Sequence, residues 1–473
     1  MLRNRETQQA AEIVIMEEMI PEGHLLRRID RAVEFGFIEK LCEPLYSKER
    51  GRPAVRPEVL FRMLFVGYLY GVKSETRLEE EINYNMAYKW FCGLNLTEKA
   101  PDATTISQNR RRKFRDNEIA EKIFEEILRQ CIEKGLVSGK VMYTDSTHVK
   151  AKANKHKKRT VTVEVTPKEY MAQLDADIDA EREAMGKKPI NRNDDPPDRP
   201  DPPEPPRREI QQSRTDPDSG QLHKEGKPDG FHYSEHRTVD SRNNVIVNVR
   251  VTAANVNDVD PIPDILRDIE RRIGKLPEYM GLDAGYHNAR VAHQLRNKKI
   301  QGVIGYRRHT HKGEHFGKYR FQYDPERNVY ICPQQHELKH RTTNRYGYRE
   351  YYSDPKICAT CPRRAECFSK KASRRQIQRH IWQADLDQAI DFQKSPRGRF
   401  LYRYRKQTIE PSFAEAKDNH GFRTARFLGL PNMCEQSFLT AAVQNMKRLA
   451  TALFSVFHSF FTVFIQKAIY APA

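Results

Sequence analysis

The chain has 473 residues, of which 82 are Lys or Arg and 64 are Asp or Glu, so its formal net charge at pH 7 is +18. That length is sufficient for two to four domains with a large apolar core. So basic a balance favours nucleic acid, or less often an anionic surface, as the partner; a generic basic protein is the alternative. Residues 1–18 are too polar for a signal peptide and residues 449–469 are too polar for a confident membrane span. A cytoplasmic protein without membrane contact is therefore expected.

Residues 1–135 are predicted to form a helical N-terminal domain. The amphipathic run 57–70 opens with a proline suited to a first helical turn, and the helical pattern continues over 78–92. A capped turn begins at Asp102, and the helix after it carries a run of cations, 110–115. A solvated charged face and contact with a nucleic-acid backbone are equally good interpretations of this run.

From residue 136 the pattern changes to strands that alternate with helices. A strand is predicted to end at Asp145, a hairpin of two strands is predicted over 230–252, and a fourth, apolar strand is predicted over 279–283, ending at Asp283. This alternation predicts an α/β fold, in which a mixed sheet carries helices on its faces. The further expected elements are helices over 261–273 and 288–299 and a strand over 302–306. The core is expected to comprise residues 136–307 and 396–473.

Two insertions are expected to interrupt this core. Residues 155–228 contain one charged helix, 167–187, and then a proline-rich run, 195–206. That run cannot form a helix or an inner strand, so it should be an extended, exposed linker. The second insertion, 308–395, is basic and holds four of the eight cysteines.

Three acidic residues stand out by their surroundings. Asp145 and Asp283 each follow an apolar strand, and Asp283 precedes an Ala-Gly pair small enough to admit a phosphate backbone. Glu410 lies on a basic helical segment. Any one of them alone is more simply explained as a cap or a surface ion pair. Three carboxylates on two strands and a helix can, however, hold two Mg²⁺ ions about 3.5–4 Å apart, an arrangement that cuts and rejoins phosphodiesters.

The segment from Tyr402 to Lys417 has the most specific pattern. Glu410 and Lys417 are two helical turns apart and share a face, and Arg405 follows Tyr402 by one turn. Pro411 removes a backbone donor and should start or kink a helix. One interpretation is a surface helix with ion pairs. The other places Glu410 on a metal ion and the cations on DNA phosphates.

The cysteines of the second insertion have the close spacing of metal ligands. Cys358, Cys361 and Cys367 follow one another at short intervals, and Cys332 lies upstream beside a proline. Four such thiolates can hold a structural Zn²⁺, with His336 able to replace one of them; free thiols are the alternative.

A basic stretch without any acid, residues 148–159, directly follows Asp145 and includes Lys150 and Lys152. A solvated loop would tolerate this charge. Contact with DNA is the favoured interpretation, because the stretch lies next to the expected metal site.

Together these patterns resemble those of bacterial insertion-sequence transposases of the DDE type, most closely the insertion sequence 1182 group. The shared features are a Thr-Asp-Ser-Thr strand at Asp145, an Asp-Ala-Gly-Tyr strand at Asp283, and a helix with Tyr, Arg, Glu and Lys at regular spacing. The match spans nearly the whole chain. It implies an RNase H-like core with Asp145, Asp283 and Glu410 as catalytic Mg²⁺ ligands. Four residues separate Arg405 from Glu410, where the broader relatives usually have three.

The resemblance also implies a function. A transposase of this kind binds the terminal inverted repeats of double-stranded DNA as a homo-dimer or larger assembly, in the bacterial nucleoid. It cleaves the ends with two Mg²⁺ ions, or Mn²⁺ in their place, and joins them to target DNA. A host nuclease or resolvase without strand transfer and a non-catalytic DNA-binding relative are the alternatives. The residues expected to position DNA phosphates are Tyr402, Arg405, Lys417, Lys150 and Lys152.

Overall fold

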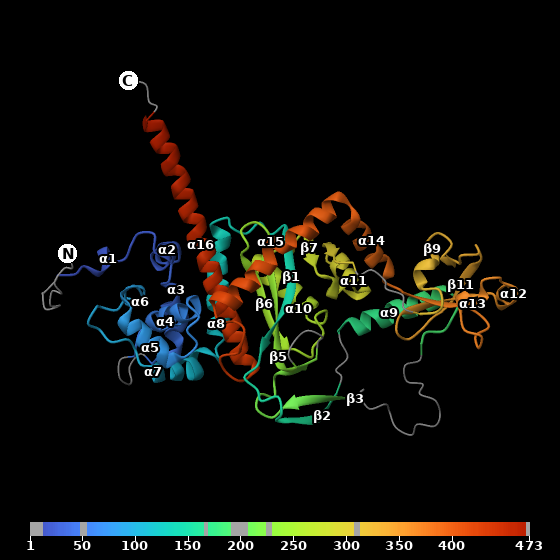
Figure 1. The fold of residues 1–473 in the computed structure, drawn as a ribbon, viewed down its shortest axis with the longest axis horizontal. Helices are drawn as coiled ribbons and strands as arrows, with labels where there is room; N and C mark the ends of the chain where they lie inside the picture. Colours follow the sequence, from blue (N-terminus) through green and yellow to red (C-terminus); the bar gives the residue numbers. More distant parts are fainter. Residues whose placement is uncertain are drawn as a thin grey trace, which may run out of the picture. The chain divides into compact units, whose positions relative to one another are not determined.

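The structure is a computed structural model that describes residues 13–47, 54–164, 169–190, 207–223, 229–306 and 313–469. The proline-rich run 195–206 lies outside these ranges. The chain divides into two compact units, and Figure 1 shows its elements in sequence colours. The first unit comprises Met1–Arg159, Gln212–Gly281 and Arg403–Ala473; the second comprises Thr160–Gln211 and Leu282–Tyr402. Within the described ranges, no helix has both the length and the apolar character needed to cross a membrane.

The N-terminal part of the first unit is helical, as the sequence predicts. Its elements are α1 (Met16–Met19), α2 (Leu25–Ala32), α3 (Phe37–Cys42), η1 (Glu43–Leu45), α4 (Pro57–Leu69), α5 (Glu75–Tyr84), α6 (Met86–Phe91), α7 (Ala103–Asn109), η2 (Arg110–Phe114) and α8 (Ile119–Glu133). Pro57 occupies the first turn of α4, where a missing N–H costs nothing. Asp102 caps α7 by accepting a hydrogen bond from the Thr105 N–H at 2.8 Å. The cation run forms the π-helical turn η2, in which Arg110 is buried and Arg111 is exposed.

The sheet of the first unit is centred on an antiparallel set of strands: β1 (Val141–Lys150), β4 (Gly220–Leu222), β5 (Gly230–Asp240) and β6 (Ile246–Ala253). β7 (Tyr279–Leu282) belongs to the same sheet. β2 (Lys158–Glu164) and β3 (Arg207–Ser213) each have residues in both units. β5 pairs with β1 along one edge and with β4 and β6 along the other, and β7 neighbours β1. The strand predicted to end at Asp145 continues to Lys150, because its register with β5 is unbroken. Asp145 therefore lies in mid-strand, directly opposite Arg237.

Three helices pack with this sheet: α10 (Ile262–Ile273), α15 (Pro396–Asn419) and α16 (Leu430–Ile469). Apolar residues of β1, β5 and β6 form one buried cluster with the C-terminal half of α15 and the start of α16, including Val149, Tyr233, Ala416 and Met433. α16 also packs against α2, α4 and α8, and Figure 1 shows it running between the helical part and the sheet. One long helix thus joins the two parts of the first unit.

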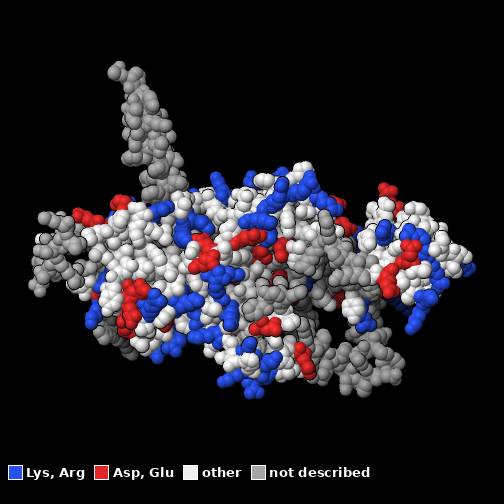
Figure 2. Space-filling view, viewed as in Figure 1, with Lys and Arg blue, Asp and Glu red and all other residues white. Residues whose placement is uncertain are grey.

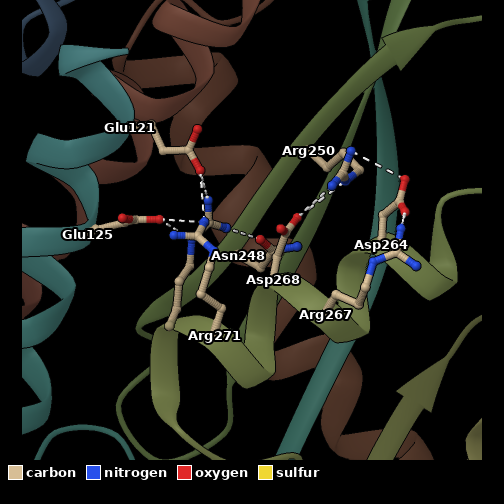
Figure 3. A network of polar contacts seen from close by, with 9 residues as sticks. Glu121, Glu125, Asn248, Arg250, Asp264, Arg267, Asp268 and Arg271 are labelled. Atoms are coloured by element: carbon tan, nitrogen blue, oxygen red, sulfur yellow. Dashed lines mark hydrogen bonds and ion pairs between the residues drawn. The ribbon is translucent and has the colours of Figure 1, made fainter. Parts of the chain in front are cut away.

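A network of ion pairs fixes α8 to β6 and α10, as Figure 3 shows. Arg272 of α10 pairs with Glu121 and Glu125 of α8, the latter at 2.9 Å, and donates to Asn248 of β6. Its side chain is only 2% exposed, so salt screens these pairs weakly. The network continues through Arg250, Asp264, Arg267, Asp268 and Arg271.

The second unit contains its own antiparallel sheet, of order β13-β12-β11-β10-β9. These strands are β9 (Gln322–Asp324), β10 (Val329–Ile331), β11 (Glu337–Thr343), β12 (Tyr348–Ser353) and β13 (Gln376–His380). Helix α9 (Glu169–Ala184) packs on this sheet: Glu181 accepts from the Thr343 hydroxyl at 2.6 Å, and Asp177 accepts from the Trp382 indole N–H at 2.7 Å. Parts of both stretches expected as insertions thus meet in one unit.

The rest of the second unit surrounds a short strand, β8 (Gln301–Ile304), on which α11 (Ala289–Asn297) and α14 (Gln383–Lys394) pack. The Gly305 N–H donates to the Leu282 carbonyl at 3.1 Å, which places β8 beside the residue before Asp283. The remaining elements are η3 (Ala284–Tyr286), η4 (Lys318–Arg320), α12 (Pro355–Ala359) and α13 (Arg364–Cys367).

Candidate active site

Two of the three predicted catalytic carboxylates lie in the first unit and share one cation. Arg405 of α15 donates from Nη1 to Asp145 Oδ2 at 2.7 Å and from Nη2 to Glu410 Oε1 at 3.0 Å. Asp145 and Arg405 are 260 residues apart, so only the fold brings them together. Asp145 Oδ1 accepts from the Ser146 N–H at 2.8 Å, which fixes the orientation of the carboxylate.

This cluster is open to exchange of partners. The side chain of Asp145 is 20% exposed and that of Glu410 is 48% exposed. Two carboxylates against one guanidinium leave a net negative charge, and carboxylate oxygens are the ligands that Mg²⁺ prefers. The pair therefore fits a divalent cation in ligand type, with Arg405 as its present counter-charge. Among the residues that the structure describes, no group of three or more His, Cys, Asp or Glu is arranged to hold a metal ion.

Glu415, the nearest rival of Glu410, has a different set of partners. It accepts hydrogen bonds from Lys447, from Arg448 at 2.8 Å and from Gln444 at 3.1 Å, all on α16. Its side chain is 13% exposed. Glu415 therefore ties α15 to α16, and Glu410 is the acidic residue of this segment that lies with Asp145.

Lys417 is half-buried rather than displayed on the surface. Burial lowers the pKa of Lys417, and the charge of Arg423 lowers it further, whereas the charge of Glu235 raises it. A partly desolvated ammonium of this kind gains from any added negative charge, whether from a carboxylate or a phosphate.

Two charged residues of β5 next to this cluster were not predicted from the sequence. Glu235 and Arg237 are fully buried and pair at 2.8 Å. Burial raises the pKa of Glu235, and the charge of Arg237 opposes that shift. The available signal was their spacing, because residues two apart in a strand share a face, and an acid and a base on one face of an inner strand suggest a buried pair.

In the second unit, Asp283 caps the short helical turn η3. Its Oδ1 accepts from the Gly285 N–H at 2.7 Å, and a Cβ on Gly285 would lie 2.9 Å from that oxygen. The Tyr402 hydroxyl approaches the same segment: a Cβ on Gly305 would lie 2.5 Å from Tyr402 Oη and 2.7 Å from the Ala284 nitrogen. Glycine is needed at both positions for this close packing. Asp283 and Tyr402 thus belong to one local cluster of the second unit.

The two elements that carry Asp145 and Glu410 also carry exposed cations. Lys150 and Lys152 are exposed at the end of β1, and Arg403 and Lys406 are exposed on α15. Figure 2 shows Lys and Arg side chains gathered along α15. The Lys150 carbonyl accepts from the Ala425 N–H at 2.8 Å, which holds this end of β1 against the chain that follows α15.

The four cysteines of the second unit line one small cavity of ≈ 40 Å³. They are Cys332, Cys358, Cys361 and Cys367. Burial raises the pKa of Cys367 to about 11, although the charge of Arg375 opposes this shift. The four thiols are close, but within the described ranges they do not adopt a metal-ligand arrangement. The structural zinc stays a prediction.

Two stretches of the chain match known protein families. Residues 14–112 match the family described as Transposase domain (DUF772), and residues 331–450 match the family described as Transposase DDE domain. The second match includes Arg405 and Glu410, whereas Asp145 and Asp283 lie outside both. None of the curated proteins matches the chain.

Solved structures give only weak likenesses. The piggyBac transposase synaptic complex with hairpin DNA is 9% identical with a TM-score of 0.28, covering 95% of this chain and 82% of that chain. The Mos1 transposase paired-end complex with the left transposon end is 11% identical with a TM-score of 0.16, covering 54% and 61%. Likenesses this weak indicate nothing about this chain. The family matches are informative, because two separate stretches of the chain match transposase families. One match lies in the helical N-terminal part, and the other includes the helix of Glu410.

Proposed function

We propose that this chain is a DNA transposase of the insertion-sequence DDE type, with an RNase H-like core. The observation that carries the proposal is the meeting of Asp145 and Glu410 on the two terminal nitrogens of Arg405. The match of residues 331–450 to a transposase DDE family supports it, because Glu410 lies inside that match. Asp283, at the end of β7, is proposed as the third carboxylate.

The chemistry follows from the side chains. Two bound Mg²⁺ ions, or Mn²⁺ ions, would activate water or a 3′-hydroxyl and stabilise the charge that develops at phosphorus. Asp145 and Asp283 would hold both ions, and Glu410 would hold one. The Ser146 N–H keeps the Asp145 carboxylate oriented. Arg405 would then bind a DNA phosphate, since a guanidinium forms strong paired hydrogen bonds with phosphate oxygens.

The proposed partner is double-stranded DNA, bound at the terminal inverted repeats and at the target, by a homo-dimer or larger assembly. The net charge of +18 supports this, because phosphate neutralisation supplies most of the non-specific affinity for DNA. Lys150, Lys152 and Lys417 are proposed to contact phosphates, together with Tyr402.

End cleavage tests the proposal. Asp145→Asn, Asp283→Asn and Glu410→Gln, made singly, should each lower Mg²⁺-dependent cleavage of the DNA that flanks the gene by at least about 10³-fold, because each removes an anionic metal ligand. Asp418→Asn is the matched control, since Asp418 is an exposed acid on the same helix. Normal cleavage by one of the three variants removes that residue from the site.

Strand transfer separates the transposase from a nuclease. Pre-cleaved ends with free 3′-hydroxyls should be joined to a target plasmid by the wild-type chain and not by Glu410→Gln. Cleavage without joining would instead identify a nuclease or resolvase. DNA binding without any nicking would identify a non-catalytic relative.

A further inference from the structure

Helix α15 has a defect directly beside Glu410. Pro411 lies inside the helix, which continues to Asn419. Proline has no N–H, so the carbonyl four residues earlier, that of Gln407, loses its helical hydrogen bond. An unpaired carbonyl costs free energy and loosens the turn that carries Glu410. Some other group must hold this turn if the carboxylate is to keep a fixed position.

Asn244 supplies the missing donor. Its Nδ2 donates to the Gln407 carbonyl at 3.2 Å. Asn244 has φ of 56°, a left-handed conformation that Asn and Gly adopt more readily than other residues, in the turn between β5 and β6. Asp240 anchors that turn by accepting hydrogen bonds from the Ser138 hydroxyl at 3.0 Å and from the Gly139 N–H at 2.8 Å.

Arg237 holds the other side of the same defect. Its Nη1 donates to the Ser412 carbonyl at 3.1 Å and to the Ser412 hydroxyl at 2.8 Å. It is fully buried, and Glu235 fixes its orientation through two hydrogen bonds of 2.9 and 2.8 Å. Arg237 also lies directly opposite Asp145 in the sheet. One hairpin therefore contacts the residues on both sides of Glu410 and pairs with the strand that carries Asp145.

We propose that Asn244 and Arg237 are positioning residues: the β5–β6 hairpin uses them to set Glu410 against Asp145 across the break that Pro411 makes. The inference rests on the proposed function of Glu410. Neither residue touches the reacting atoms. Their effect on the reaction is to limit the freedom of the Glu410 carboxylate, and misplacement of a metal ligand by a fraction of an ångström lowers the rate.

Asn244→Gly tests the role of the amide. Glycine accepts the left-handed conformation without strain and removes only the donor. We expect kcat for end cleavage to fall by about 10-fold with KM for DNA unchanged, since the DNA contacts stay in place. Mn²⁺ binding to the free protein, followed by the electron paramagnetic resonance signal of unbound Mn²⁺, should weaken several-fold. Asn243→Gly is the matched control in the same turn, because the Asn243 amide donates to Leu136 and not to α15.

Pro411→Ala provides a rescue. Alanine restores an N–H that can serve the Gln407 carbonyl, so the amide of Asn244 becomes redundant. Asn244→Gly should therefore lower the thermal midpoint in the wild-type background and change it little in the Pro411→Ala background. Equal losses in both backgrounds would show that Asn244 acts elsewhere and would overturn the proposal.

Arg237→Lys tests the positioning role of Arg237 independently of Asn244. Lysine keeps a positive charge beside Glu235 but cannot serve Glu235 and Ser412 together, so it should repeat the loss of kcat at unchanged KM. Glu410→Gln separates the proposed metal-binding role of Glu410 from the positioning role of Asn244 and Arg237. If Glu410→Gln cleaves normally, the proposed role of Glu410 fails. If it is inactive while Asn244→Gly and Arg237→Lys retain wild-type kcat and Mn²⁺ binding, only the positioning role fails.

Discussion

Two clusters of the first unit each place one arginine between two carboxylates, but in different surroundings. Arg405 binds Asp145 and Glu410, and Arg110 likewise binds two glutamates, one of them Glu435. The Glu410 side chain is 48% exposed, whereas the Glu435 side chain is 7% exposed. Water, ions and DNA can compete for an exposed ion pair, but a buried pair has no alternative partner. Exposure, more than residue type, therefore separates a site that can exchange ligands from one that holds the fold together.

The buried cluster joins the helical part of the chain to α16. Arg110 comes from η2, and Glu435 comes from the first turns of α16. The guanidinium of Arg110 also lies over the ring of Phe427, 3.6 Å from its centroid. Loss of either Arg110 or Glu435 would leave the other buried without its counter-charge. This cluster should therefore contribute more to stability than the cluster at Arg405.

The largest expected effect is that of Arg110→Met. Methionine fills much of the volume and leaves Glu75 and the buried Glu435 without the guanidinium that they share, which should lower the free energy of unfolding by about 3–5 kcal/mol at pH 8. Arg111→Met is the matched control, because Arg111 is exposed on the same turn and should change stability by about 0.5 kcal/mol or less. Urea denaturation of both variants measures the difference. Equal stability of the two variants would show that the buried cluster does not hold the helical part in place.

The pH dependence of stability also distinguishes the buried cluster at Arg110 from the cluster at Arg405. Burial raises the pKa of Glu435 from 4.5 to about 7, although the charge of Arg110 opposes the shift. A raised carboxyl pKa means that the folded state favours the protonated form. Protonation of Glu435 therefore adds up to about 3 kcal/mol to the free energy of unfolding. This contribution is fully present below pH 4.5, declines as the pH rises, and is lost above about pH 7.

Glu435→Gln should remove that dependence. Urea denaturation at several pH values measures the free energy of unfolding of wild type and variant. The difference between the two should change between pH 4.5 and pH 7 and be constant above pH 7. A flat difference for Glu435→Gln would mean that this carboxyl keeps an ordinary pKa in the folded protein.

The sequence predicted local features well and long-range ones poorly. The cap at Asp102 and the helix over 261–273 depend on neighbouring residues, and the structure has both, with α10 beginning one residue later. The extension of β1 beyond Asp145 could not be predicted, because its polar residues pair with buried polar residues of β5. Three candidate acids could be named from their contexts. That Arg405 would connect two of them depends on the fold, since 260 residues separate it from Asp145.

A small effect on stability is expected of Arg405→Gln, which should lower the free energy of unfolding by about 1 kcal/mol, because water reaches the carboxylates of Asp145 (20% exposed) and Glu410 (48% exposed). Its effect on metal binding should be larger and opposite in sign. Arg405 neutralises part of the charge on Asp145 and Glu410, so its removal should tighten Mn²⁺ binding to the DNA-free protein by about 5–10-fold.

Electron paramagnetic resonance of unbound Mn²⁺ measures this change, and Arg405→Gln combined with Glu410→Gln is the control that should lose the gain. The result decides how the exposed cluster works. Tighter binding means that Arg405 competes with the ion and must leave the carboxylates when the metal arrives, which frees the guanidinium for a DNA phosphate. Weaker binding would mean that Arg405 keeps two mutually repelling carboxylates together, in which case Arg405, like Arg110, acts as a structural residue.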